Sequence, residues 1–198
     1  MTEAFNLILS YRKHLETKLD PMRYEHSLSV SYTCMNLAMR YGCDMEKAEL
    51  AGLLHDCGKR YSDDIILKKC KKHGIAFTAE EEAAPAVLHA NYGAWLAQHK
   101  YGVSDPEVLS AILYHTTGKP AMGMLEKIVY IADYIEPRRY KADNLPEMRK
   151  LAYLDLDETM YQILKGTVNY LKKKGGKTDP MTLDAYVYYE QVHMRREE

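Results

Sequence analysis

Helix start and stop signals recur along the whole chain, whereas no segment shows sustained apolar–polar alternation rich in Val, Ile and Thr. Asp105 followed by Pro106 is typical of a helix start, and Gly42 and Gly74 are typical of helix ends. This pattern predicts a single all-α domain, a helical bundle of about nine or ten helices. The expected helices cover residues 5–19, 22–41, 45–56, 65–72, 86–101, 108–115, 124–135, 145–154, 158–174 and a last segment from 180.

The composition argues against a nucleic-acid-binding or membrane-spanning protein. The chain has 198 residues, enough for one substantial core, and its 27 basic and 28 acidic residues give a formal charge of −1. The longest stretch without charged residues, 83–99, contains Pro85 and two histidines, so it does not resemble a membrane span. The four cysteines have no C-x-x-C spacing, and the chain does not begin like a signal peptide. We therefore expect a cytoplasmic protein with reduced thiols.

The segment Leu53-Leu54-His55-Asp56-Cys57-Gly58-Lys59 places an imidazole and a carboxylate next to each other at the end of an apolar helix. Gly58 is expected to end this helix in the left-handed conformation. Neighbouring side chains diverge by about 100° on a helix, so His55 and Asp56 would approach a metal centre from two sides. The alternative is a buried core histidine followed by an aspartate that bonds a local N–H group.

Six ionisable residues share an unusual setting, near helix ends and often among apolar neighbours: His26, His55, Asp56, His89, His115 and Asp133. Such groups are costly to bury unless they are paired or coordinated. The remaining histidines lie among charged or amide residues and are expected at the surface: His14, His73, His99 and His193.

Four imidazoles and two carboxylates without a thiolate form a nitrogen and oxygen donor set. This set suits iron, manganese, cobalt or catalytic zinc and disfavours a structural zinc site. Six protein ligands exceed what one catalytic ion normally takes with open positions, but they fit two divalent ions that share a carboxylate. Asp56 is the candidate bridge, because its neighbour His55 would hold one ion while its two oxygens span both.

The order His26, His55-Asp56, Asp133 resembles the HD superfamily of metal-dependent phosphohydrolases, and His89 and His115 resemble its two-metal branch. Four segments, in order, are similar to the bacterial YqeK-type subfamily of symmetrical bis(5'-nucleosyl)-tetraphosphatases: His55-Asp56-Cys57-Gly58-Lys59, His89-Ala90, His115-Thr116-Thr117-Gly118 and Ala132-Asp133-Tyr134-Ile135-Glu136-Pro137. The similarity extends over nearly the whole chain.

This resemblance implies an HD fold with a metal-binding core at roughly 20–140, on which C-terminal helices at 141–198 pack. It also implies a di-iron centre and symmetrical hydrolysis of diadenosine tetraphosphate to two ADP. One departure is Arg138, which stands where the family pattern has glycine, beside Arg139.

The expected roles follow from residue type. One ion would be held by His26, His55 and Asp133, the other by His89 and His115, and Asp56 would bridge them. A hydroxide shared by the ions would attack a phosphoanhydride, since bound water becomes more acidic and the ions neutralise phosphate charge. The predicted catalytic residues are Asp56, as the bridge, and Lys59, which could bind a phosphate oxygen or aid the leaving group.

Predicted substrate contacts lie next to these ligands in sequence: Arg23, Lys59, Thr116, Thr117, Gly118 and Arg139. The two arginines suit forked contacts to phosphate, and the Thr-Thr-Gly turn offers hydroxyl and N–H groups. Lys59 is equally interpretable as a helix-capping lysine. Arg138 is expected to be a solvated surface residue.

Several functions remain open at this stage. The chemistry also fits another HD nucleotide phosphohydrolase, such as a cyclic-dinucleotide phosphodiesterase or a guanosine alarmone hydrolase. A nucleotide-binding regulatory HD domain is a second alternative, and a structural helical protein is a third. The expected partner is a nucleotide, with neither a nucleic acid polymer nor a membrane, and a homodimer is left open.

Overall fold

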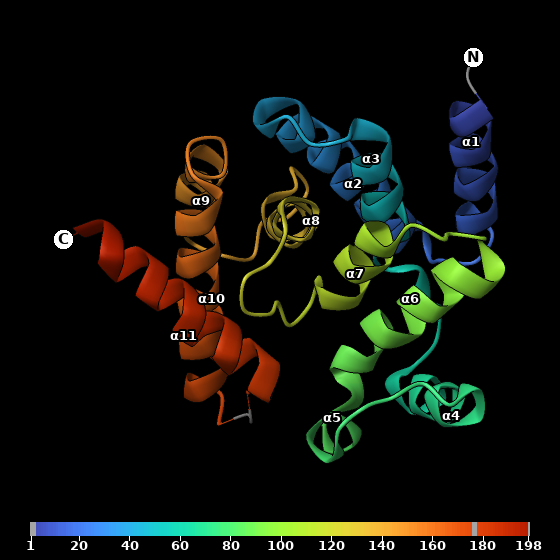
Figure 1. The fold of residues 1–198 in the computed structure, drawn as a ribbon. Helices are drawn as coiled ribbons and strands as arrows, with labels where there is room; N and C mark the ends of the chain where they lie inside the picture. The colour runs from blue at the N-terminus through green and yellow to red at the C-terminus, as the bar shows by residue number, and fades with distance from the viewer. Residues whose placement is uncertain (1–2, 176–177, 198) are drawn as a thin grey trace.

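The polypeptide is folded into helices joined by short connections in the computed structural model, which describes residues 3–175 and 178–197 (Figure 1). Within these residues no β-strand occurs, so the predicted all-α class is confirmed. The helices are α1 Glu3–Glu16, α2 Pro21–Tyr41, α3 Met45–Leu54, η1 Cys57–Arg60, α4 Asp63–His73, α5 Ala79–Ala83, η2 Pro85–Val87, α6 Leu88–Lys100, α7 Pro106–Tyr114, α8 Met124–Ile135, α9 Leu145–Leu151, α10 Leu156–Lys173 and α11 Pro180–Glu197, where η1 and η2 are 3-10 helices.

Several helix boundaries arise from the capping residues that the sequence offers. The Asp44 carboxylate accepts the N–H groups of the first turn of α3, and Asp105 does the same for α7. Gly42 and Gly74 end α2 and α4 with φ of 70° and 65°, a conformation that costs glycine little. The boundaries at Asp105, Gly42 and Gly74 confirm the sequence-based prediction, and the cap at Asp44 adds one that was not predicted.

The core lies where α2, α3, α6, α7 and α8 meet. In Figure 1, α8 lies between the α2–α3 pair and the group formed by α9, α10 and α11, and it contacts α2, α3, α7, α9 and α10. Its apolar residues, including Ile128 and Ile131, are fully buried, as are Leu53 of α3 and Ile112 of α7. Helices from both ends of the chain therefore pack on α8, and this arrangement fixes the ends of α2, α3, α6, α7 and α8 relative to one another.

Two local predictions were wrong. Gly58 does not end α3 in the left-handed conformation, because α3 already ends at Leu54 and Gly58 lies in η1 without a positive φ. A Cβ atom there would lie only 2.4 Å from the carbonyl oxygen of His89, so close backbone approach explains this glycine. The short helix α5 was not predicted, although Thr78 and Glu81 form the capping box that starts it. The described residues thus contain eleven α-helices instead of nine or ten.

None of the helices in the described part of the chain is both long and apolar enough to cross a bilayer.

Candidate metal centre

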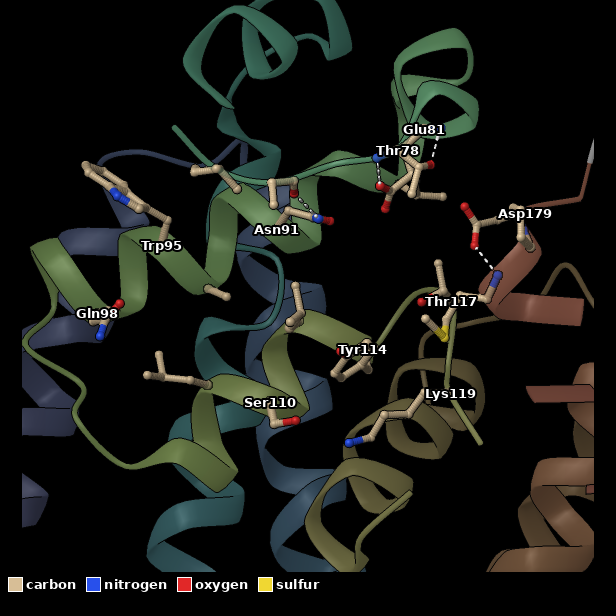
Figure 2. Close-up of a pocket in the computed structure, with 18 of the residues that line it drawn as sticks. Thr78, Glu81, Asn91, Trp95, Gln98, Ser110, Tyr114, Thr117, Lys119 and Asp179 are labelled. Carbon is tan, nitrogen blue, oxygen red and sulfur yellow. Dashed lines mark hydrogen bonds between the residues drawn. The ribbon is translucent and has the colours of Figure 1, made fainter. Parts of the chain in front are cut away.

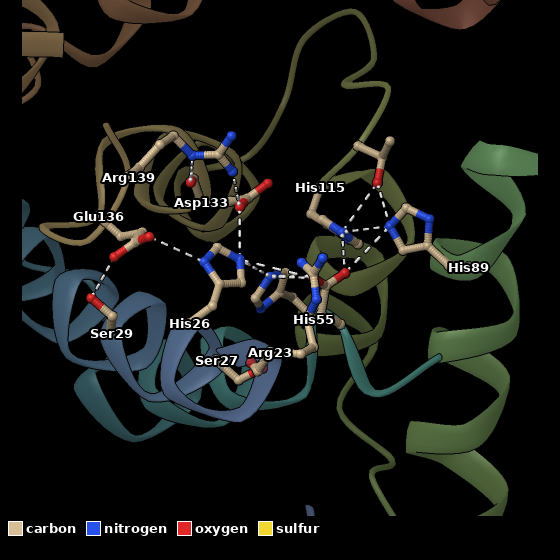
Figure 3. Close-up of polar contacts among 12 residues, drawn as sticks. Arg23, His26, Ser27, Ser29, His55, His89, His115, Asp133, Glu136 and Arg139 are labelled. Atoms are coloured by element: carbon tan, nitrogen blue, oxygen red, sulfur yellow. Dashed lines mark hydrogen bonds and ion pairs between the residues drawn. The ribbon is translucent and has the colours of Figure 1, made fainter. Parts of the chain in front are cut away.

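The structure brings all six predicted ligand residues together from the ends or first turns of five helices. Figure 3 shows His26, His55, His89, His115 and Asp133 among them. Three of them follow or lie in the last turns of helices, since His55 follows α3, His115 follows α7 and Asp133 lies near the end of α8. His26 lies in α2 and His89 in the first turn of α6. Described side chains form three overlapping groups able to hold an ion, each with its ligand atoms within 4.8 Å of one another, namely His26–His55–Asp56, His55–His115–Asp133 and Asp56–His89–His115.

The Asp56 carboxylate lies between two pairs of histidines. Its Oδ2 atom is 3.8 Å from Nε2 of His26 and 3.5 Å from Nε2 of His55. Its Oδ1 atom is 3.4 Å from Nε2 of His89 and 3.5 Å from Nε2 of His115. Because each oxygen faces its own pair of imidazoles, the group has the geometry of a bridge between two ions.

Hydrogen bonds to backbone carbonyls fix three of these imidazoles. The Nδ1 atoms of His55, His89 and His115 each lie 2.7 Å from the carbonyl oxygen three residues earlier. A carbonyl only accepts hydrogen bonds, so Nδ1 carries the proton and Nε2 of each neutral ring keeps a free lone pair. All three lone pairs are therefore directed toward Asp56 and toward one another.

The spacing of the Nε2 atoms suits a shared cation. Nε2 of His89 and Nε2 of His115 are only 3.2 Å apart, and Nε2 of His55 is 3.3 Å from Nε2 of His26. Two ligand atoms that bind one ion at about 2.1 Å are separated by roughly 3 Å, which is close to both of these distances. The donor set therefore fits two divalent ions, one on each side of Asp56.

Burial keeps the imidazoles of His55 and His89 neutral. It lowers the pKa of His55 to about 4, and burial together with the nearby His115 lowers the pKa of His89 to about 3. Burial alone would raise the pKa of Asp56, but the surrounding histidines lower it well below its usual range. The centre therefore combines an ionised Asp56 carboxylate with neutral imidazoles at His55 and His89, which are the protonation states that metal ligands need.

Comparison with known proteins agrees with this geometry. The family model described as HD domain matches residues 23–138, which contain all six residues of the cluster. The chain belongs to the HD domain family. The predicted family is thus confirmed.

Relatives of this HD protein carry a more specific name. It is 38% identical over 177 residues to "Bis(5'-nucleosyl)-tetraphosphatase, symmetrical" of Bacillus subtilis, covering 87% of this chain and 91% of the relative. The protein of the same name from Staphylococcus aureus is 39% identical over 180 residues, covering 87% and 89%. A crystal structure from Clostridium acetobutylicum, described as a predicted HD superfamily hydrolase involved in NAD metabolism, is 38% identical, with a TM-score of 0.89 over 92% of this chain and 96% of that one.

Two of the predicted cationic contacts bond acidic residues of the HD cluster directly. Nη1 of Arg23 lies 2.6 Å from Oδ2 of Asp56, and Nη2 of Arg139 lies 2.8 Å from Oδ1 of Asp133. Both side chains remain more than a third exposed, at 37% and 36%, so further N–H groups face solvent at the centre. Arg138 instead pairs with Glu25 and is 61% exposed, as expected of a surface residue.

Lys59 follows Asp56 in η1 and is half-buried. Its ammonium makes no ion pair with the described residues, yet it lies near enough to His89 to contribute to the lowered pKa of that imidazole. A positively charged group is therefore available on the His89 side of the centre, opposite Arg139 on the Asp133 side.

The Thr116-Thr117-Gly118 turn divides into one residue at the centre and two that bond internally. The Thr116 hydroxyl lies 3.0 Å from Nε2 of His89 and 3.1 Å from Nε2 of His115. The buried Thr117 hydroxyl donates to the Gly118 carbonyl, and the Gly118 N–H donates to Tyr114. Those bonds leave no N–H of Gly118 for phosphate, so the prediction that this turn cradles phosphate is retained only for Thr116.

A groove of about 840 Å³ includes Thr117, two residues after His115, in its lining (Figure 2). It runs along α6 and α7, with half-buried apolar side chains such as Leu113 and Tyr114 in its wall and the amide of Asn91 beside them. His115 of the segment that follows α7 thus lies in the histidine cluster, and Thr117 of the same segment lines the groove.

Sequence reasoning assigned no role to Glu136, although this residue lies at the edge of the cluster. Its Oε1 atom is 3.2 Å from Nδ1 of His26, and its Oε2 atom accepts the Ser29 hydroxyl at 2.6 Å. Burial opposes protonation of His26, but the carboxylates of Asp133 and Glu136 raise its pKa to about 9. The sequence did contain a signal for this role, because Glu136 directly follows the helix that carries the predicted ligand Asp133.

Proposed function

We propose that this HD protein is a metal-dependent hydrolase that cleaves dinucleoside tetraphosphates symmetrically into two nucleoside diphosphates, with diadenosine tetraphosphate giving two ADP. The main structural support for this proposal is the Asp56 carboxylate, whose two oxygens face separate histidine pairs. The names of the relatives at 38–39% identity over most of their length support the substrate class.

The short distances from Asp56 to each histidine pair support the following assignment. His26, His55 and Asp133 would hold one divalent ion, His89 and His115 would hold the other, and Asp56 would bridge them. Iron is the proposed native metal, and manganese, cobalt or zinc accept the same donors. When bound, such ions acidify water and offset negative charge on phosphoryl oxygens.

Cationic side chains lie on both sides of the centre, as a symmetric polyphosphate substrate would need. Arg139 lies on the Asp133 side and Lys59 on the His89 side, so one cationic group flanks each half of a tetraphosphate that is cut at its middle. Arg23 has N–H groups beyond the one that bonds Asp56, and these would orient a phosphate between the two. The Thr116 hydroxyl would bond a phosphate oxygen from the remaining side.

The groove along α6 and α7 is the proposed place for one nucleoside. Its lining includes Thr117, the neighbour of Thr116 in sequence, and it combines apolar and aromatic walls with the side-chain amide of Asn91. Pockets for organic ligands share this composition, in which apolar surface gives affinity and a few polar groups fix orientation. We further propose that 1–198 acts as one unit, since α9 and α10 pack on α8, which carries Asp133.

Product analysis with metal-loaded protein tests the proposal. Purified protein is freed of metal, reloaded with Mn²⁺ or with Fe²⁺ under anaerobic conditions, and incubated with diadenosine tetraphosphate. We expect ADP as the only nucleotide product and no turnover in the Asp56→Asn variant. Release of AMP and ATP would contradict symmetrical cleavage.

Parallel incubations cover the competing functions. Turnover of a cyclic dinucleotide or of a guanosine alarmone, without turnover of diadenosine tetraphosphate, would favour those substrates instead. Bound metal and bound nucleotide without turnover of any of the three would favour a regulatory domain.

A further inference from the structure

Among the four histidines of the cluster, His26 is oriented differently from the rest. The Nδ1 atoms of His55, His89 and His115 bond backbone carbonyls three residues earlier in the chain. Nδ1 of His26 instead lies 3.2 Å from Oε1 of Glu136, a residue just beyond the end of a different helix, α8. The direction of this one imidazole therefore depends on tertiary structure.

Burial and two hydrogen bonds fix the position of the Glu136 side chain. Its side chain is 4% exposed, and its Oε2 atom accepts both the Ser29 hydroxyl at 2.6 Å and the backbone N–H of Arg138 at 2.7 Å. These two bonds leave Oε1 directed at His26. Because Oε1 bonds Nδ1, the opposite nitrogen, Nε2, faces Oδ1 of Asp133 at 3.1 Å (Figure 3). The same nitrogen lies 3.8 Å from Oδ2 of Asp56.

The turn that carries Glu136 is itself held by the C-terminal part of the chain. Arg149 of α9 donates from Nε to the Ile135 carbonyl at 2.9 Å, and from Nη2 to the carbonyls of Glu136 and Arg139 at 2.8 and 2.7 Å. One guanidinium therefore bonds three backbone carbonyls of the 135–139 turn. This link connects the 23–138 HD region to a helix outside it.

We propose that Glu136 is a positioning residue that aims His26 at its ion, and that Arg149 holds the turn from which Glu136 acts. This inference rests on the proposed function, because it concerns the same metal centre. Outer carboxylates that bond a ligand imidazole typically contribute 10- to 100-fold to metal affinity. The role is directional: it requires a hydrogen-bond acceptor at the position of Oε1.

The chain offers a matched control in Glu126. That glutamate is also buried at a helix end, where it accepts a serine hydroxyl from Ser110, the N–H of Gly123 at 2.7 Å and the ammonium of Lys119 at 2.8 Å. Its bonds resemble those of Glu136 in kind, but none of them reaches a histidine of the cluster. Substitution of Glu126 therefore reports the cost of losing a buried glutamate alone.

The first measurement needs no metal. In metal-free protein with ¹⁵N-labelled histidine, the Nδ1–H proton of His26 should give a protected resonance in the parent and in Glu126→Gln. We expect this resonance to be lost in Glu136→Ala and retained in Glu136→Gln, whose amide oxygen still accepts. An unchanged His26 resonance in Glu136→Ala would overturn the proposal.

The second measurement is the affinity of each variant for Mn²⁺, determined by chelator competition. Glu136→Ala should bind one of the two ions 10- to 100-fold more weakly, with partial recovery in Glu136→Gln and parent affinity in Glu126→Gln. Parent affinity in Glu136→Ala would overturn the proposal, and if that variant does not fold, Glu136→Gln and Glu136→Asp decide. If the parent binds no metal, the proposed function fails, while the imidazole resonance still reports on Glu136.

A third variant isolates the helix α9 link. Arg149→Met should weaken binding of the same ion and broaden the His26 resonance, because the turn loses its three hydrogen bonds to Arg149. Parent values for both would overturn the part of the proposal that concerns Arg149.

Discussion

Oδ1 of Asp56 lies 3.4 Å from Nε2 of His89, while Oδ2 of the same carboxylate faces His26 and His55. One side chain thus contacts histidines on both sides of the centre. Removing it should affect two ions, whereas removing an outer histidine should affect one.

Asp56→Asn should therefore lose both ions and reduce hydrolysis by about a thousandfold or more, because two-ion sites depend on the shared ligand. His89→Ala should keep one ion. Metal content per chain, measured by plasma emission after gel filtration, separates the two outcomes. Equal metal content in both variants would contradict a bridging role for Asp56.

Arg139→Ala should raise KM with metal content unchanged. A charged hydrogen bond to phosphate contributes about 1.5–3 kcal/mol, which corresponds to roughly a 10- to 100-fold increase. The neighbouring Arg138→Ala is the control, since its guanidinium pairs with Glu25 at the surface. Loss of metal in Arg139→Ala, or an equal effect in Arg138→Ala, would argue against a phosphate contact.

Gly58→Ala should destabilise the fold and weaken binding of the ion on the His89 side. The new Cβ would lie 2.4 Å from the His89 carbonyl oxygen, so η1 and α6 must separate, at a cost of about 1–3 kcal/mol. Gly166→Ala in α10 meets nothing within 4 Å and should stabilise the protein by about 0.5–1 kcal/mol. Urea unfolding measures both, and a neutral Gly58→Ala would contradict the close approach.

Nucleotide binding should change the fluorescence of Trp95, which is the single tryptophan of the chain and lines the groove along α6 and α7. Addition of ADP to metal-loaded protein is expected to shift or quench this signal, and Asn91→Leu should weaken the response. Saturating ADP without any spectral change would place the nucleoside elsewhere.

Acid should destabilise the parent more steeply than Glu126→Gln. Burial alone would raise the pKa of Glu126, but the ammonium of Lys119 and the hydroxyl of Ser110 lower it below the ordinary value of 4.5. A carboxylate with a lowered folded-state pKa stabilises the fold above pH 4.5, and this stabilisation is lost as pH falls through the folded pKa. Unfolding free energies measured between pH 6 and 3 should therefore converge for the two proteins toward acid; parallel curves would contradict this role.

Sequence patterns predicted features that depend on local chemistry. Capping aspartates and glycines such as Asp105 and Gly42 act within a few residues of themselves, so the helix boundaries they mark were found correctly. The six clustered side chains were also anticipated, because imidazoles and carboxylates among apolar neighbours are costly to bury unless they are paired or bind a metal.

Features that depend on packing between helices were not accessible from sequence. Gly58 was assigned to a helix end, but the atom that requires glycine there is the carbonyl oxygen of His89 on another helix. The role of Glu136 likewise depends on α8 meeting α2, and the internal bonds of Thr117 and Gly118 depend on the course of the turn. Linear spacing does not encode these contacts.

Anomalous diffraction from metal-loaded crystals tests the central claim most directly. Data collected at the manganese or iron edge should show two peaks, one between Asp56 and the His26–His55 pair and one between Asp56 and the His89–His115 pair. A single peak, or two peaks that do not share the Asp56 carboxylate, would contradict the account.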